Sequence, residues 1–293
     1  MLTGSITALV TPFKNNKINY RKLEELIEFQ IQNKTDGIVI CGTTGENSTL
    51  SQNEKKKIVK FSVNTIRNRI PLIAGTGSNN SKESLNLSKY ASDVGSDYVL
   101  LVSPYYNKTS QRGLISHYSY IADSVPIPCI LYNVPSRTGL NISAKTSIFL
   151  SDHPNIVGLK EASGNMPQAL EILANCSKDN FSVFSGNDDI IVPMLSIGSS
   201  GVISVLSNIL PKEVHDMCFY YLNGNHEYSK ILQLKYSNII SAIFSDVNPI
   251  PIKEAMNILE FDVGDPRLPL IKMEDTSILE KALINVPKYS NNI

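Results

Sequence analysis

One lysine ends a strongly apolar run of the sequence. Lys160 follows Ile-Val-Gly-Leu at 156–159, and a lysine amine is seldom buried unless it is paired or reactive. Tyr132 ends the preceding apolar run, so in a parallel barrel its phenol would lie beside Lys160 and relay protons. A lysine amine forms an imine with a keto acid, which then yields an enamine carbon nucleophile. The pattern predicts Schiff-base chemistry without a separate cofactor; the alternative is a strand-end lysine whose ammonium reaches water.

Two further stretches offer groups that bind carboxylates. Residues 42–46 read GTTGE, and their hydroxyls and glycine turns suit a carboxylate held by backbone N–H groups. An ordinary polar turn is the alternative, and the stretch lacks the GK[ST] ending of a phosphate loop. Arg137, within YNVPSRTG at 132–139, could grip a carboxylate in a two-point fork, but its spacing fits a surface arginine equally well.

Short apolar runs recur along the chain and predict the strands that position these groups. Each run is followed by a turn and a helical pattern, which is the alternation of βα units. About eight runs are present, centred on SITALV from Ser5, GIVIC from Gly37, PLIAG from Pro71, YVLLV from Tyr98, PCILY from Pro128, IVGLK from Ile156, FSVFS from Phe181 and GVISV from Gly201.

Helix signals lie between these runs. Ser51 and Glu54 form an S-x-x-E capping box, and Asn80 with Glu83 could start a later helix in a similar way. The apolar residues of 23–31 follow the spacing of a helix with one buried stripe. These signals indicate that the predicted strands alternate with helices.

Eight apolar strands that alternate with helices are better buried in a closed parallel barrel than in an open sheet with two edges. We therefore predict a (β/α)₈ TIM barrel over residues 1–222. From 223 to 293 the strand signals stop, and the stretches 231–244, 252–259 and 276–283 read as helical. We expect this C-terminal helical extension to pack on the barrel. The carboxyl ends of the strands would then carry the active site.

Composition narrows the class of function. The chain has 293 residues with 27 basic and 27 acidic side chains and a formal net charge of +0, which predicts neither nucleic-acid nor membrane binding. The N-terminus does not read as a signal peptide, so we expect a cytoplasmic protein. The histidines are dispersed and predict no metal site. The four cysteines form no CxxC pair and are expected to be reduced core thiols: Cys41, Cys129, Cys176 and Cys218.

Five motifs together resemble one enzyme family from about Gly4 to the stretch that begins at Pro249. They are GTTGE, SPYYN, YNVPSRTG, GLKEASGN and GVISV, in this order. The chain resembles the dihydrodipicolinate synthases, also called 4-hydroxy-tetrahydrodipicolinate synthases, of the pyruvate-dependent class I aldolase and N-acetylneuraminate lyase superfamily. The resemblance implies a lyase that condenses pyruvate with L-aspartate 4-semialdehyde and eliminates water, in diaminopimelate and lysine biosynthesis.

The resemblance also implies catalytic roles. Lys160 would carry the covalent pyruvate imine, and Tyr132 would donate and accept protons. Thr43 and Tyr106 match the family's proton relay, in which the tyrosine reaches across a subunit interface. The resemblance therefore implies a homotetramer, built as a dimer of dimers, in which assembly matters for activity.

Substrate-binding positions carry over in the same way. Thr44 and Ile203 match pyruvate-site residues, and Arg137 matches the residue that receives the carboxylate of the aldehyde substrate. The family's substrate-binding glycine corresponds to Gly186. The stretch SGNDD at 185–189 has one residue more than the family's usual SGDD.

A regulatory cleft for lysine is implied by four matching positions: Ser48, Asn79, Glu83 and Tyr105. Two other positions depart from the lysine-inhibited members, which commonly carry histidines there. Gln52 and Lys55 stand at these positions, and Lys55 would place a cation near the incoming lysine. We therefore expect no strong feedback inhibition.

Three other functions remain open from the residues. N-acetylneuraminate lyases share the barrel lysine and the pyruvate imine but generally lack the SRTG continuation after YN-x-P. A non-catalytic binding module is compatible with the fold, because a fold does not determine its function. A metal-dependent aldolase could use Asp188 and Asp189, although adjacent carboxylates at a solvated helix start are the simpler interpretation.

Overall fold

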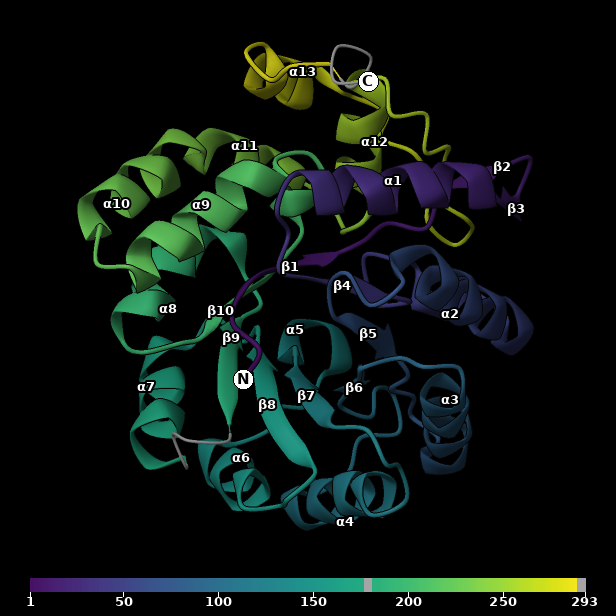
Figure 1. Cartoon of the computed structure of the whole chain (residues 1–293), viewed down its shortest axis with the longest axis vertical. Coiled ribbons are helices and arrows are strands. Elements are labelled where there is room, and N and C mark those ends of the chain that lie inside the picture. Colours follow the sequence, from purple (N-terminus) through teal and green to yellow (C-terminus); the bar gives the residue numbers. More distant parts are fainter. Residues whose placement is uncertain (177–180, 289–293) are drawn as a thin grey trace.

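Eight parallel strands close into a barrel in the computed structural model, which describes residues 1–176 and 181–288 (Figure 1). Around the barrel the strand order is β1-β10-β9-β8-β7-β6-β5-β4, and β4 pairs with β1 to close it. All eight predicted strands are confirmed: β1 (Gly4–Ala8), β4 (Gly37–Ile40), β5 (Leu72–Gly75), β6 (Tyr98–Val102), β7 (Cys129–Asn133), β8 (Ile156–Glu161), β9 (Ser182–Ser185) and β10 (Gly201–Ser204).

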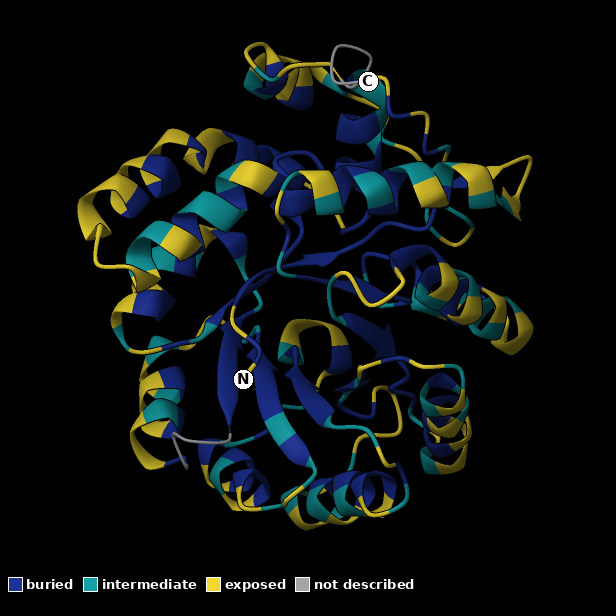
Figure 2. Cartoon of the chain, in the orientation of Figure 1, coloured by how far each residue is buried: buried dark blue, intermediate teal, exposed yellow. Residues whose placement is uncertain are grey.

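Helices surround the barrel and bury their inner faces against it, as the change from blue to yellow across each helix shows (Figure 2). One helix or more follows each barrel strand: α1 (Tyr20–Gln32), α2 (Gln52–Ile66), α3 (Ser81–Asp93), α4 (Gln111–Ala122), α5 (Pro135–Thr138), α6 (Ala144–Ser151), α7 (Met166–Asn175), α8 (Ile191–Ser196) and α9 (Pro211–Leu222). In the described ranges 1–176 and 181–288, no helix is long and apolar enough to cross a membrane.

Local sequence explains where individual helices begin. Ser51 and Glu54 make both reciprocal bonds of the predicted capping box at the start of α2. Asn80 caps α3 by accepting hydrogen bonds from the backbone N–H groups of Lys82 and Glu83. Side-chain caps therefore position the helices that follow β4 and β5.

The hydrophobic core has two layers, one inside the barrel and one between barrel and helices. The inner layer is built from alternate strand residues: Ile6, Val39, Ile73, Leu100, Ile130, Tyr132, Phe184 and Ile203. The outer layer joins the opposite strand faces to the helices and includes the buried stripe of α1. All four cysteines are free and buried, as predicted.

A helical segment follows α9, as the strand signals predicted. It comprises α10 (His226–Lys235), α11 (Ser237–Ile243), α12 (Ile250–Ile258) and α13 (Ser277–Leu283). A short antiparallel hairpin of β2 (Phe13–Lys14) and β3 (Lys17–Ile18), which the pattern did not predict, lies between β1 and α1. Figure 1 shows α12 and α13 above α1, so the C-terminal segment lies over the end of the first βα unit.

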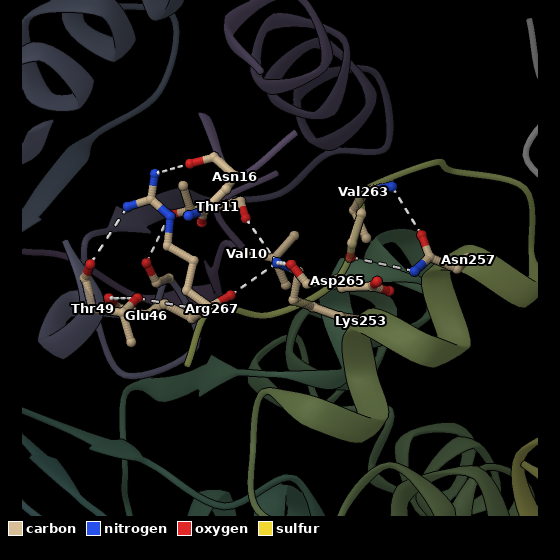
Figure 3. Close-up of polar contacts among 12 residues, drawn as sticks. Val10, Thr11, Asn16, Glu46, Thr49, Lys253, Asn257, Val263, Asp265 and Arg267 are labelled. Atoms are coloured by element: carbon tan, nitrogen blue, oxygen red, sulfur yellow. Dashed lines mark hydrogen bonds and ion pairs between the residues drawn. The ribbon is translucent and has the colours of Figure 1, made fainter. Parts of the chain in front are cut away.

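A buried ion pair joins α12 to the loop after β4 (Figure 3). The Lys253 ammonium donates to Glu46 Oε1 at 2.8 Å and to the carbonyl oxygens of Thr11 and Asp265 at 3.2 and 3.1 Å. The other Glu46 oxygen accepts from the backbone N–H of Arg267 at 2.9 Å. Burial lowers the pKa of Lys253, and the Glu46 carboxylate opposes that shift. Because these bonds offset the cost of desolvating both charges, the pair fixes the loop to the C-terminal segment.

Replacing one partner of this pair should destabilise the protein strongly. We expect Lys253→Met to lower the free energy of unfolding by about 3–5 kcal/mol, because Glu46 would stay buried without a cation. Glu46→Gln with Lys253→Met should recover much of the loss. Urea denaturation measures both effects.

An exposed pair provides the matched control. The Lys230 ammonium lies 2.7 Å from the Glu227 carboxylate, and 54% and 71% of the two side chains are exposed. Lys230→Met should therefore lower the free energy of unfolding by less than about 1 kcal/mol. Equal losses from Lys253→Met and Lys230→Met would contradict the importance of the buried pair.

Candidate active site

Lys160 and Tyr132 face each other inside the barrel mouth. The two residues are partners in the parallel register of β7 and β8, and the Lys160 ammonium lies 4.6 Å from the centroid of the Tyr132 ring. Their side chains are buried, with 5% and 6% of each residue exposed. A lysine that extends from the strand end into bulk solvent is therefore not what the structure shows. The structure brings a buried amine and a phenol together, as imine chemistry requires.

The next pair of partner residues along β7 and β8 connects the ends of these two strands by hydrogen bonds. Asn133 is the partner of Glu161 and donates to its carboxylate at 3.0 Å. The carboxylate also accepts from the backbone N–H of Ser163 at 2.6 Å and from the side chain of Gln168 at 3.1 Å. These bonds satisfy a buried charge with neutral donors and hold the strand ends that carry Lys160 and Tyr132.

Asp188, after β9, is a buried carboxylate near Lys160. It accepts from the Ser204 hydroxyl at 2.5 Å and from the backbone N–H groups of Val205 and Leu206 at 2.9 and 3.1 Å. Burial raises the pKa of Asp188, while these bonds and the Lys160 charge oppose the rise. The expectation of a solvated helix start is therefore wrong for Asp188. Its position at the carboxyl end of a barrel strand was the signal that could have indicated a role.

A cavity of about 220 Å³ opens beside Tyr132 at the carboxyl ends of the strands. Several predicted site residues line it: Thr43, Tyr132, Arg137, Ser48 and Tyr105. Val247, Asn248 and Pro249, from the segment before α12, complete one wall. The cavity therefore combines predicted catalytic, substrate-binding and regulatory residues with a segment outside the barrel.

Arg137 is held at this wall by a residue that sequence reasoning missed. It lies in the short helix α5, which begins at Pro135, and its guanidinium donates to the carbonyl oxygen of Asn248 at 3.1 Å. The side-chain amide of Asn248 donates to the Thr44 hydroxyl at 3.0 Å. Both Thr44 and Asn248 are buried. The motifs identified in the sequence did not include Asn248, and its partners are distant in sequence.

Three further predicted residues, Ile203, Gly186 and Tyr106, do not line the cavity. Ile203 is fully buried in the inner core of the barrel. Gly186 lies so close to Ala162 that an added Cβ would come within 2.5 Å of the alanine methyl, so this position requires glycine. Tyr106 has a φ of 67°, is 91% exposed and does not line the cavity.

The four predicted regulatory residues do not all lie together. Ser48 and Tyr105 line the cavity, whereas Glu83 lies in the first turn of α3 and accepts from the Ser78 hydroxyl at 3.4 Å. The carbonyl oxygen of Asn79 accepts from Asn107 at 2.9 Å. These positions therefore extend from the cavity wall to the start of α3.

Lys55 is the nearby cation that the sequence identified. Burial lowers the pKa of its ammonium, while the charges of Cys41 and Glu83 oppose the shift. Within the described part of the chain, no group of three or more His, Cys, Asp or Glu side chains could hold a metal ion.

Comparison with known proteins agrees with this geometry. A model of the Dihydrodipicolinate synthetase family matches residues 1–284. The 4-hydroxy-tetrahydrodipicolinate synthase of Clostridium novyi (strain NT) is 52% identical over 293 residues, which cover 99% of this chain and 98% of that protein.

Solved structures show the same similarity. The dihydrodipicolinate synthase of Aquifex aeolicus is 41% identical with a TM-score of 0.94, over 98% of this chain and 99% of that chain. The chloride-inhibited dihydrodipicolinate synthase of Acinetobacter baumannii, complexed with pyruvate, is 39% identical with a TM-score of 0.94 over the same shares. This chain belongs to the dihydrodipicolinate synthetase family.

Proposed function

We propose that this protein condenses pyruvate with L-aspartate 4-semialdehyde to give 4-hydroxy-tetrahydrodipicolinate and water. The buried Lys160 amine beside the Tyr132 phenol carries this proposal. The name shared by relatives about half identical over nearly the whole chain supports it, as does the pyruvate complex of the Acinetobacter baumannii enzyme. The reaction belongs to diaminopimelate and lysine biosynthesis.

The reaction begins on the lysine amine. The neutral amine of Lys160 attacks the ketone carbon of pyruvate, and loss of water leaves a protonated imine. The imine withdraws electrons, so a methyl proton leaves and an enamine forms. Tyr132 is adjacent to the reacting nitrogen and moves these protons. Thr43, in the cavity wall, continues the relay. The lysine itself provides the electron sink, so the step needs no separate organic cofactor.

The enamine carbon then attacks the aldehyde, forming the new C–C bond while the aldehyde oxygen takes a proton. The amino group of the semialdehyde attacks the imine carbon, which closes the six-membered ring and releases Lys160. Arg137 binds the carboxylate of the semialdehyde at the exposed side of the cavity, where its guanidinium is anchored on the Asn248 carbonyl. Thr44, Gly186 and Ile203 shape the pyruvate side.

An N-acetylneuraminate lyase would use the same imine with a different acceptor. Arg137 favours the semialdehyde, because a guanidinium pairs with a carboxylate and gives a neutral sugar no comparable partner. The acceptor side of the cavity therefore decides between the two reactions.

Covalent capture of pyruvate should depend on Lys160. After incubation with pyruvate and borohydride, mass spectrometry should find one reduced adduct on Lys160 in the wild type and none in Lys160→Ala, which lacks the amine. Lys57→Ala, which removes an exposed lysine of α2, should be labelled like the wild type. An adduct on Lys160→Ala, or none on folded wild type, would exclude this role.

Arg137→Ala should separate pyruvate capture from condensation. We expect normal labelling of Lys160 but a rise of about 10- to 100-fold in the half-saturating semialdehyde concentration, because a charge-assisted bond contributes about 1.5–3 kcal/mol. Steady-state kinetics with varied semialdehyde measures this, and Arg112→Ala, at an exposed arginine, serves as control. Equal loss of capture and condensation would count against the assigned role.

Tyr106 acts in a neighbouring subunit of a homotetramer built as a dimer of dimers. Support comes from its exposed ring, which can reach a neighbouring chain, and from its left-handed backbone conformation, which is costly for a residue without a function. Mixed oligomers of inactive Lys160→Ala and Tyr106→Phe chains should regain activity, because one site would receive both intact residues. No recovery in verified mixed oligomers would contradict donation across the interface.

The predicted regulatory positions Ser48, Asn79, Glu83 and Tyr105, which extend from the cavity wall to the start of α3, should bind lysine weakly. The Lys55 ammonium lies close enough to interact with Glu83 and would repel the ligand's own cation. Initial rates over a lysine titration test this proposal, and strong inhibition at micromolar lysine would overturn it.

A further inference from the structure

We propose that Asn248 positions the Thr44 hydroxyl so that its proton points at the carboxylate of pyruvate. Asn248 belongs to the segment between α11 and α12, outside the barrel. It is therefore a positioning residue that acts through Thr44. The inference deepens the proposed function and rests on it, because it concerns the pyruvate side of the same site.

The hydrogen-bond direction carries the argument. A hydroxyl has one proton to donate and two lone pairs that accept. The amide N–H of Asn248 donates to Thr44 Oγ1 at 3.0 Å, which occupies one lone pair and leaves the proton of Thr44 available. An anionic carboxylate is a strong acceptor for that proton. The bond therefore orients the Thr44 hydroxyl so that its proton is available to donate to an anion.

Burial makes this orientation effective. Thr44 and Asn248 are 2% and 6% exposed, so water competes little for either group. The side-chain oxygen of Asn248 has no hydrogen-bond partner among the described residues, and no second donor fixes the amide. Thr44 is thus the contact through which the Asn248 amide influences the site.

The backbone carbonyl of Asn248 contacts Arg137, which we propose binds the other substrate, the semialdehyde. Arg137 donates to the carbonyl oxygen of Asn248 at 3.1 Å, and this oxygen remains when the side chain is changed. Side-chain variants of Asn248 should therefore affect the pyruvate side while leaving the anchor of Arg137 intact. A general structural role would disturb both substrates together.

The segment that carries Asn248 is itself firmly held. Lys253, in the first turn of α12, is bound to Glu46, and Glu46 follows Thr44 by two positions in the GTTGE loop. Two contacts, one through the Asn248 amide and one through the buried ion pair, therefore connect the same loop to the same C-terminal segment.

The test measures pyruvate capture over a range of pyruvate concentrations, with borohydride trapping on Lys160 as readout. We expect Asn248→Ala to raise the half-saturating pyruvate concentration about three- to tenfold, because one neutral hydrogen bond contributes about 0.5–1.5 kcal/mol. Labelling at saturating pyruvate and the KM for the semialdehyde should stay close to wild type. Asn223→Ala, at an exposed asparagine at the end of α9, is the matched control.

A double-mutant cycle shows whether Asn248 acts through Thr44. In a Thr44→Val background the hydroxyl is absent, so adding Asn248→Ala should raise the half-saturating concentration no further. An equal rise in both backgrounds, no rise from Asn248→Ala when Thr44 is intact, or an equal rise in the semialdehyde KM would each overturn the inference. If the wild type captures no pyruvate, the proposed function fails first and this inference falls with it.

An isosteric variant covers the case in which Asn248→Ala does not fold. Asn248→Asp keeps the shape, but its ionised carboxylate only accepts hydrogen bonds and turns the Thr44 proton away from pyruvate. Its half-saturating pyruvate concentration should rise more than tenfold at pH 8, where the carboxylate is ionised. Wild-type affinity at pH 8 would overturn the inference.

Discussion

Closure of eight parallel strands into one barrel decides which side chains meet at its mouth. Register pairs Tyr132 with Lys160, and the inward alternation of both strands turns their side chains toward one another. Loops are not needed for this contact. The hydrogen-bonded pair of Asn133 and Glu161, one position further along the strands, keeps the ends from fraying. The Lys160 amine, which we propose forms the imine, is therefore buried by the same geometry that builds the core.

Loops and the segment before α12 complete the wall of the cavity at the barrel mouth, and we propose that their side chains recognise the two substrates. The segment around α12 reaches back to the barrel mouth at two points, through Asn248 to Thr44 and through Lys253 to Glu46. Arg137 donates a hydrogen bond to the same segment, at the carbonyl oxygen of Asn248. The residues proposed to bind the substrates are thus joined by hydrogen bonds across more than one hundred positions, whereas Lys160 and Tyr132 lie on neighbouring strands.

The strands, the starts of α2 and α3 and the Lys160–Tyr132 contact could be predicted from the sequence because they follow from local periodicity, capping residues and strand order. Asn248 could not, because a loop partner distant in the chain leaves no periodic signal. Asp188 was expected in solvent, since two adjacent acids usually mark an exposed helix start. Its burial depends on the backbone N–H groups after β10, which no local pattern reveals.

We propose that the buried Lys160 and its surroundings serve the condensation of pyruvate with aspartate semialdehyde. The most direct measurement compares product formation by the purified protein from pyruvate with L-aspartate 4-semialdehyde and from pyruvate with N-acetylmannosamine. We predict turnover of the semialdehyde and none of the sugar, because Arg137 offers a partner only to a carboxylate. Turnover of the sugar in preference to the semialdehyde, or no turnover of the semialdehyde by protein that captures pyruvate, would contradict the account.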